Sequence, residues 1–82
     1  MLTKYIQAAM RGAKYEILED DGSFYGYIPE TRGVWANADT LEECREELES
    51  VLEDWILFGL HHHLPIPVIQ EIDLNQPQEE LA

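Results

Sequence analysis

Carboxylates gather around the first predicted turn of the chain, and they are the residues that most suggest an enzyme. These are Glu16, Glu19, Asp20 and Asp21. A metal-dependent nuclease needs several carboxylates that converge on Mg²⁺ from the ends of strands and helices. Turn chemistry is a sufficient explanation for Asp20 and Asp21, because an Asp-Gly pair tolerates the positive φ angles of hairpins. We therefore expect no catalytic residues, no enzyme activity and no cofactor.

Three consecutive histidines, His61 to His63, are the second chemical candidate. Imidazole is a common ligand of zinc and nickel. Consecutive residues rarely converge on one ion, however, and no cysteine is close enough in the sequence to complete a site. We expect no metal there. The better interpretation is that cationic histidine is favoured near a helix C-terminus.

Cys44 is the single cysteine of the chain, so it cannot form an intrachain disulfide. It falls on the apolar stripe of a predicted helix. We therefore interpret Cys44 as a small buried apolar residue rather than as a redox sensor.

The charge balance predicts the class of partner. The 82 residues include 17 acidic and 5 basic side chains, for a formal net charge of −12. The electrostatic field of this negative charge repels nucleic acid and favours a basic protein partner. Nucleic-acid binding also requires clustered Lys and Arg. We expect no direct contact with nucleic acid. The alternative is that the charge only keeps a small protein in solution.

The sequence predicts a cytoplasmic protein. A lone cysteine fits a reducing compartment. The first ten residues lack the uninterrupted apolar core of a signal peptide. The longest apolar run, Trp55 to Phe58, is far below the ~20 residues that span a bilayer.

These side chains must be positioned by one small domain. Helical spacing predicts a short helix over Met1 to Gly12. Three strands follow, over Lys14 to Leu18, Phe24 to Ile28 and Gly33 to Ala38, and they form an antiparallel meander. Pro29 ends the second strand, because proline cannot donate to a ladder.

The main helix is predicted to begin after Thr40, which forms a capping box with Glu43. We expect Gly59 to end it. Its predicted buried stripe is Leu41, Cys44, Leu48, Val51, Leu52, Trp55 and Phe58. Its predicted solvent face carries Glu42, Glu46, Glu49, Glu53 and Asp54.

The remaining chain is predicted to contain little regular structure. Residues 60–67 are expected to be irregular because of two prolines, and Val68 to Ile72 to form a short final strand. The fold class is therefore α+β, with a three- to four-stranded antiparallel sheet, one long helix on one face and a short N-terminal helix. We expect one domain over 1–72 with an N-terminal extension over 1–12, and a polar acidic tail over 73–82.

Two surfaces are candidates for binding another protein. One is the acidic helix face of Glu42, Glu46, Glu49 and Glu53, which the alternative interpretation leaves as a solvated face. The other is the sheet face opposite the long helix, with Tyr25, Tyr27 and Trp35. The alternative for the aromatic residues is ordinary packing under the N-terminal helix. A thin core and open sheet edges also predict a homodimer or a homotetramer.

The stretch from Gly26 to Cys44, GYIPETRGVWANADTLEEC, resembles the HicB antitoxin family. The matching features are an aromatic and glycine-rich strand that ends in proline, a small-residue strand, and a helix start at Thr40. Ile66-Pro67-Val68 resembles the short strand after that helix, so the resemblance covers residues 13 to 70. It implies an antiparallel sheet with a long helix across one face, in a degraded relative of the ribonuclease H fold.

The resemblance also implies a function. HicB antitoxins bind and mask HicA, a small basic toxin that cleaves mRNA. Many family members add a C-terminal DNA-binding domain, but only 14 residues follow Val68 here, so we do not expect direct operator binding. The expected function is neutralisation of a small basic HicA-like toxin. The alternatives are a stand-alone oligomeric interaction or regulatory protein of the same fold and, third, a nuclease.

Overall fold

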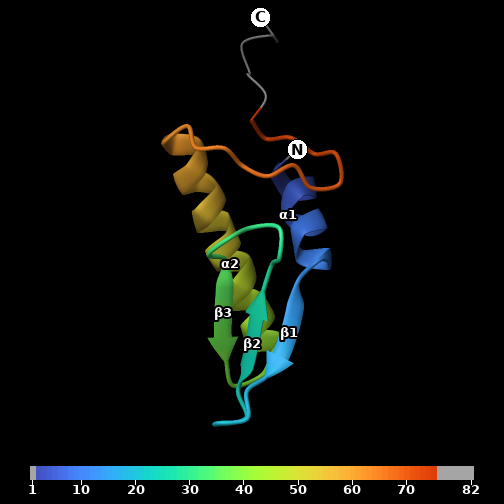
Figure 1. The fold of residues 1–82 in the computed structure, drawn as a ribbon, viewed down its shortest axis with the longest axis vertical. Coiled ribbons are helices and arrows are strands. Elements are labelled where there is room, and N and C mark those ends of the chain that lie inside the picture. Colours follow the sequence, from blue (N-terminus) through green and yellow to red (C-terminus); the bar gives the residue numbers. More distant parts are fainter. Residues whose placement is uncertain (1, 76–82) are drawn as a thin grey trace, which may run out of the picture.

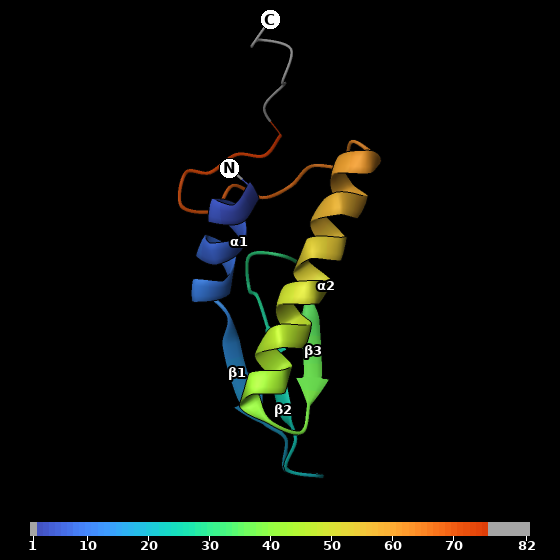
Figure 2. The same cartoon turned by 180° about the vertical axis from the view of Figure 1, so that it is seen from behind.

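The fold is a two-layer arrangement of a small sheet and a long helix (Figure 1). The computed structural model describes residues 2–75. Along the chain follow α1 (Leu2–Arg11), β1 (Lys14–Ile17), β2 (Phe24–Tyr27), β3 (Trp35–Ala38) and α2 (Leu41–His61). The strands form one antiparallel sheet in the order β1-β2-β3, and α2 lies behind it, as the reverse view shows (Figure 2). The predicted α+β class is confirmed, with three strands in the sheet.

The first hairpin is fixed by its turn. Gly22 has a positive φ of 70°, and Asp21 Oδ1 accepts hydrogen bonds from the Ser23 backbone N–H at 2.9 Å and from its hydroxyl at 2.7 Å. The Leu18 N–H donates to the Ser23 carbonyl at 2.8 Å. These contacts set the register that places Tyr15 opposite Gly26. The predicted turn chemistry of the Asp-Gly pair is therefore confirmed.

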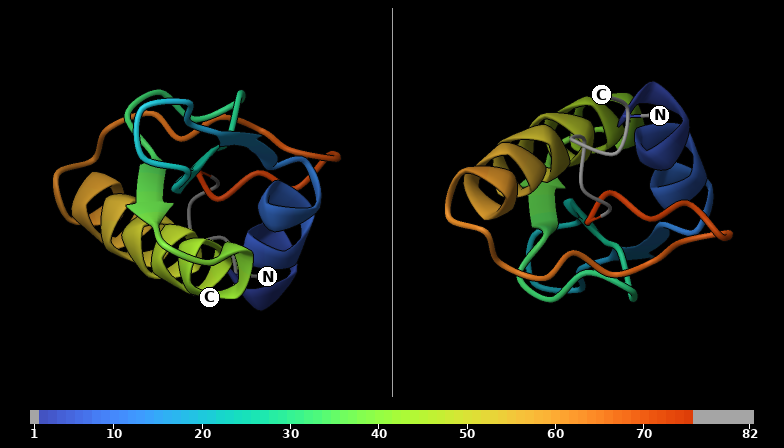
Figure 3. Two further views of the ribbon diagram at one scale, coloured as in Figure 1. Left: turned by 90° about the horizontal axis from the view of Figure 1, so that it is seen from below. Right: turned by 90° about the horizontal axis from the view of Figure 1, so that it is seen from above.

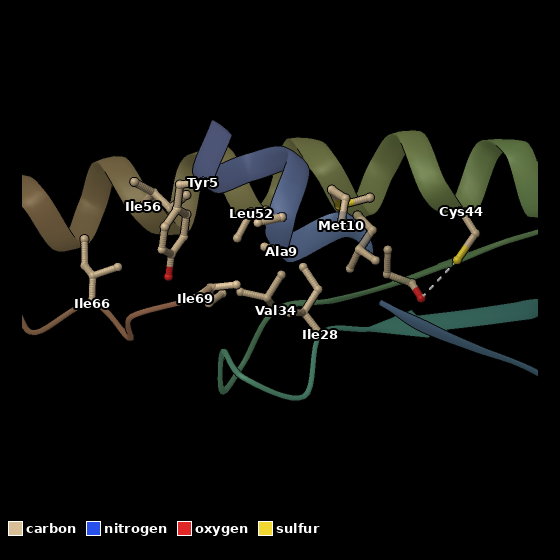
Figure 4. Close-up of a cluster of buried hydrophobic side chains, with 13 residues drawn as sticks. Tyr5, Ala9, Met10, Ile28, Val34, Cys44, Leu52, Ile56, Ile66 and Ile69 are labelled. Atoms are coloured by element: carbon tan, nitrogen blue, oxygen red, sulfur yellow. Dashed lines mark hydrogen bonds between the residues drawn. The ribbon is translucent and has the colours of Figure 1, made fainter. Parts of the chain in front are cut away.

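The core lies between α2, the inner face of the sheet, α1 and the C-terminal segment (Figure 4). Four side chains of α2 are fully buried at intervals of four residues, and they are Cys44, Leu48, Leu52 and Ile56. The predicted stripe is wrong at both of its ends, because Leu41 and Phe58 are exposed and Ile56 is buried. A strict interval of four residues rotates the buried line slowly around a helix of 3.6 residues per turn. It therefore reaches Ile56 rather than Phe58.

The predicted end of α2 at Gly59 is also wrong. Gly59 is a buried residue inside the helix, and an added Cβ there would lie 3.5 Å from Ile66. The helix instead ends with His63 in the left-handed region, at a φ of 57°. The Leu64 N–H donates to the Gly59 carbonyl at 2.8 Å and the His63 N–H to the Leu60 carbonyl at 3.3 Å, the pattern of a Schellman cap. Gly59 thus serves close packing, and a histidine takes the position usually given to glycine.

The segment after α2 returns to α1 (Figure 3). The Tyr5 hydroxyl donates to the Pro67 carbonyl at 2.6 Å, and Arg11 Nη2 donates to Gln70 Oε1 at 3.4 Å. The predicted strand over Val68 to Ile72 is wrong. A single antiparallel bridge joins Ile69 to Ile72 across a turn whose two central residues have positive φ.

Asn75 closes this segment. Its amide donates to the Ile66 carbonyl at 2.6 Å and its Oδ1 accepts from the Ile66 N–H at 2.9 Å. The fold therefore continues to Asn75, beyond the expected boundary at residue 72. The rest of the predicted tail lies outside the described residues.

Candidate protein-binding surfaces

Six side chains project from the side of the sheet that faces away from α2, and we call them the outer sheet face. They are Lys14, Glu16, Tyr25, Tyr27, Trp35 and Asn37. The strand register sorts them into two rows that run across the sheet. Lys14, Tyr27 and Trp35 lie opposite one another in one row, and Glu16, Tyr25 and Asn37 in the other.

Aromatic rings occupy the centre of the outer sheet face. The Tyr25 ring centroid lies 5.6 Å from that of Tyr27 and 6.0 Å from that of Trp35. Trp35 remains 51% exposed. Asn37 is held in place, because its amide donates to Ser23 Oγ at 2.8 Å and to the Phe24 carbonyl at 2.9 Å. The result is a preorganised apolar surface with polar groups at its margins.

Helix α1 does not cover this surface. It packs against α2, and among the described elements it makes no close contact with a strand. Its side chains Tyr5, Ala8 and Ala9 are buried. Tyr5 and Ala9 lie in the core on the α2 side of the molecule (Figure 4). The alternative that Tyr25, Tyr27 and Trp35 pack under the N-terminal helix is therefore wrong within one chain.

The predicted acidic residues of α2 are all exposed. These are Glu42, Glu46, Glu49, Glu53 and Asp54. At roughly 100° per residue, the first four fall within about 60° of the helix circumference, and we call these four the acidic helix face. Asp54 points to a different side, about 100° beyond Glu53. The four glutamates form one continuous row of negative charge along α2.

A shallow groove between α1 and α2 borders the acidic helix face, and the sequence did not predict it. It has a volume of about 180 Å³ and is lined by Ile6, Gln7, Met10, Arg11, Arg45 and Glu49. Two of the five basic residues of the chain therefore gather beside Glu49. The i, i+4 spacing of Arg45 and Glu49 was the available signal.

Cys44 is fully buried, as predicted. Its Sγ lies 3.6 Å from the Ala36 carbonyl oxygen, to which the thiol donates a weak hydrogen bond. Burial raises the pKa of the Cys44 thiol, and the negative charge of Glu47 raises it further. The neutral thiol is therefore favoured, which makes Cys44 a packing residue rather than a nucleophile.

Among the carboxylates near the hairpin, Asp21 has a structural role in the turn. Hydrogen bonds from Ser23 lower the pKa of Asp21, and they use Asp21 as part of the turn. Glu16 lies on the outer sheet face. Within residues 2–75, no group of three or more His, Cys, Asp or Glu side chains is arranged to hold a metal ion.

The histidines at the C-terminal end of α2 lie beside a second exposed apolar region. The Phe58 ring centroid lies 4.3 Å from that of His62, and His61 meets His62 edge-on at 4.9 Å. The exposed apolar side chains at this end are Leu57, Phe58, Leu60, Leu64 and Val68. This region was not predicted, because the helical stripe indicated that Phe58 would be buried.

Comparisons with known proteins place this arrangement in a family. Residues 4–67 match the family model described as UPF0150-like. The chain belongs to the UPF0150-like family. It is also similar to the crystal structure of TTHA0281 from Thermus thermophilus, with 38% sequence identity, a TM-score of 0.84, and coverage of 94% of this chain and 95% of that chain. No curated protein gives a significant match.

The UPF0150-like region includes both candidate surfaces. It begins inside α1 and extends through α2 to Pro67. Helix α1 is therefore part of the family region. Neither helix within the described part of this UPF0150-like chain is long and apolar enough to cross a membrane.

Proposed function

We propose that this UPF0150-like chain is a HicB-like antitoxin domain that binds and neutralises a small basic mRNA-cleaving toxin of the HicA type. The proposal rests on the resemblance of residues 26–44 to HicB antitoxins. The UPF0150-like family is itself associated in general with HicB-like toxin–antitoxin proteins. Because such a toxin acts on mRNA, the proposal places the protein in the cytoplasm.

The acidic helix face is the observation that carries the proposal. Helix α2 contains seven acidic residues and one arginine, a net charge of −6, which is half of the −12 of the whole chain. The four glutamates of the acidic helix face are exposed on one side of this helix. An RNA-cleaving toxin must offer cations to phosphates, and a fixed row of carboxylates competes for the same cations. Complementary charge of this kind chiefly raises the association rate and selects the partner.

Binding, not catalysis, is the proposed mode of action. The described carboxylates do not gather at one point, and the acidic helix face has no buried base or nucleophile beside it. Purified protein is expected to leave RNA intact in the presence of Mg²⁺. Cleavage that is lost in Glu16→Ala would replace the antitoxin proposal with the nuclease alternative.

A stand-alone interaction protein of the same fold is the second candidate. The partly buried rings of Tyr25 and Tyr27 and the exposed ring of Trp35 favour it, because a surface of this kind can serve self-association without any toxin. The two candidates differ in genome context. A neighbouring reading frame for a basic protein of ~60–80 residues, the size of a minimal domain, favours the antitoxin. The absence of such a frame favours the stand-alone protein.

Co-expression tests the proposal directly. The neighbouring basic protein is expressed alone and together with this chain, and growth and co-purification are measured. The antitoxin proposal expects growth arrest by the basic protein alone, and both rescue and co-purification when the two are combined. Rescue without a physical complex would contradict it.

Two charge-reversal pairs on α2 test the acidic helix face. Glu46→Lys with Glu53→Lys alters the face, whereas Glu47→Lys with Asp54→Lys changes the net charge equally about 100° around the helix. We expect the first pair to slow association about ten-fold at low salt and the second to slow it much less. Equal effects of both pairs would show that only the total charge matters.

A further inference from the structure

The outer sheet face is the electrically neutral side of a strongly acidic protein. Its six side chains include one cation, Lys14, and one anion, Glu16. Half of the net charge lies on α2, in the other layer of the fold (Figure 2). A second copy of the chain can therefore approach this face without bringing the two acidic helices together.

The spacing of the layers sets the distance between the two acidic helices in such a dimer. Packed sheets lie about 10 Å apart, and each α2 would lie behind its own sheet. The two helices would then be separated by much more than the Debye length of about 8 Å at physiological salt. Contact through the acidic helix face would instead place like charges within that length.

We propose that the outer sheet face binds the same face of a second copy, related by a two-fold axis that lies between the two sheets and runs perpendicular to the strands. This inference does not depend on the proposed antitoxin function. Its physical basis is that a two-fold interface must be complementary to itself.

The two rows of the outer sheet face have that self-complementarity. A two-fold axis perpendicular to the strands keeps β1 over β1 of the partner and exchanges the rows. Lys14 then lies over Glu16 of the other copy, and Glu16 lies over its Lys14. Tyr27 lies over Tyr25, so that aromatic rings meet at the centre. Two opposite-charge pairs and an aromatic centre form together.

The other in-plane axis, parallel to the strands, is unfavourable. It would place β1 over β3, so that both charged side chains face Trp35 or Asn37 instead of each other. It would also bring the two hairpin turns to the same end. Each turn carries Glu19, Asp20 and Asp21, and these carboxylates would repel one another. The perpendicular axis puts the turns at opposite ends.

The size of the face predicts a weak association. Four residues along a strand span about 14 Å and three strands about the same, a footprint of roughly 200 Å². A standard interface buries about 800 Å² on each partner, so this face is small for a stable dimer. We therefore expect concentration-dependent dimers in the micromolar range, and sedimentation should be measured from about 1 to 500 μM.

Trp35 provides a direct probe of the interface. Its emission is recorded against protein concentration in a Trp55→Phe background, which leaves Trp35 as the only tryptophan. Because the side chain is 51% exposed, burial in a dimer shifts its emission to the blue over the concentration range in which sedimentation reports dimers. A constant Trp35 spectrum while dimers form would overturn the proposal.

Exchange of the charges at Lys14 and Glu16 tests the proposed two-fold axis. Lys14→Glu is expected to weaken the dimer about ten-fold at low salt, because both pairs become repulsive. Lys14→Glu combined with Glu16→Lys is expected to restore the wild-type dimer within about three-fold. Lys4→Glu is the matched control, since it changes the net charge equally on the exposed side of α1. Equal weakening by Lys14→Glu and Lys4→Glu, or no recovery in the exchanged pair, would refute this geometry.

A monomer at every concentration would also refute it. If Trp35 emission then shifted only when a basic protein was added, the outer sheet face would belong to that partner. The antitoxin proposal would survive in that case, and the dimer would not. Circular dichroism of each variant confirms that only folded protein is compared.

Discussion

Tyr5 connects the N-terminal helix to the segment that returns after α2, and its removal should show how much that connection contributes. The ring is fully buried, and its hydroxyl donates to the Pro67 carbonyl at 2.6 Å. Tyr5→Phe keeps the ring and leaves that partly buried carbonyl without its donor. The loss of such a hydrogen bond costs about 1–2 kcal/mol. For a domain of this size, that loss lowers Tm by about 5–15 °C.

The matched control is Tyr27→Phe, which removes a hydroxyl from the outer sheet face. Its effect on the free energy of unfolding should stay within about 0.5 kcal/mol, as for most surface changes. Both variants are measured by urea denaturation and thermal melts below 1 μM, where the proposed dimer is dissociated. A loss below about 0.5 kcal/mol in Tyr5→Phe would refute a structural role for the hydroxyl.

The free energy of unfolding of wild type and of Tyr5→Phe should also depend differently on pH. Burial and, to a smaller extent, the negative charge of Glu30 together raise the pKa of Tyr5 to about 12. In the unfolded chain the phenol titrates near its ordinary value of about 10. Because the pKa is higher in the folded state, the stabilisation is fully present below pH 10 and is lost as pH rises toward 12.

The contribution of Tyr5 can be isolated as a difference. Other tyrosines are common to both proteins, so their titration cancels in the comparison of wild type with Tyr5→Phe. After allowance for solvent screening, wild type should lose about 1 kcal/mol more than Tyr5→Phe between pH 8 and pH 11. A stability difference that is the same at both pH values would show that the Tyr5 hydroxyl stays in contact with water.

Three further substitutions test local features of the fold by thermal and urea unfolding. Gly26→Ala places a Cβ 2.9 Å from two ring atoms of Tyr15, and should destabilise by about 1–3 kcal/mol; a neutral effect would mean that the ring moves freely. His63→Gly relieves a φ of 57° at the helix end and should stabilise by about 0.5–1 kcal/mol, whereas any destabilisation would contradict the Schellman cap. Asn75→Ala removes both hydrogen bonds to Ile66 and should lower the free energy of unfolding by about 1–2 kcal/mol. The Ile66 amide should then exchange faster, and unchanged exchange would refute the proposed role of Asn75 in holding Ile66.

The sequence predicts those parts of the fold that are encoded by neighbouring residues. The Thr40 N-cap is an example, because its hydroxyl accepts from the Glu43 N–H at 3.1 Å; the Glu43 carboxylate accepts from the Thr40 hydroxyl at 3.2 Å rather than from the backbone N–H of a full capping box. The Asp21-Gly22 turn is another, and it fixes the register of the first hairpin. Strand alternation then suffices to place Tyr25, Tyr27 and Trp35 on one side of the sheet.

Features set by distant contacts were not predictable in this way. Gly59 has the composition of a helix stop, but the position of Ile66 above it makes it a packing residue within α2. Ile66 is itself fixed by Asn75. The choice between a strand and a turn at residues 68–72 likewise depends on where α1 lies. Such long-range contacts leave no periodic signal in the sequence.

The candidate surfaces also combine features that local sequence predicts with features that depend on distant contacts. The exposure of Glu42, Glu46 and Glu53 follows from helix periodicity alone. Whether the rings of the outer sheet face are covered depends on the packing direction of α1, which the sequence left open. The groove that joins Arg11 to Arg45 also requires α1 and α2 to be neighbours. Local patterns thus identify which residues share a face, and tertiary packing decides what covers it.

The two proposed interfaces lie on opposite layers of the fold, and the charge of the chain couples them. Two copies joined through their neutral faces still carry −12 each, and at low salt, where the Debye length reaches about 30 Å, this mutual repulsion weakens the dimer. A basic protein bound at each acidic helix face lowers that charge without touching the contact between the sheets. The dimer should then become tighter. Because coupling between two binding equilibria is reciprocal, the dimer must bind the basic protein more tightly than the monomer by the same factor. Assembly of a four-chain complex would therefore be cooperative for electrostatic reasons alone, and added salt would weaken that cooperativity.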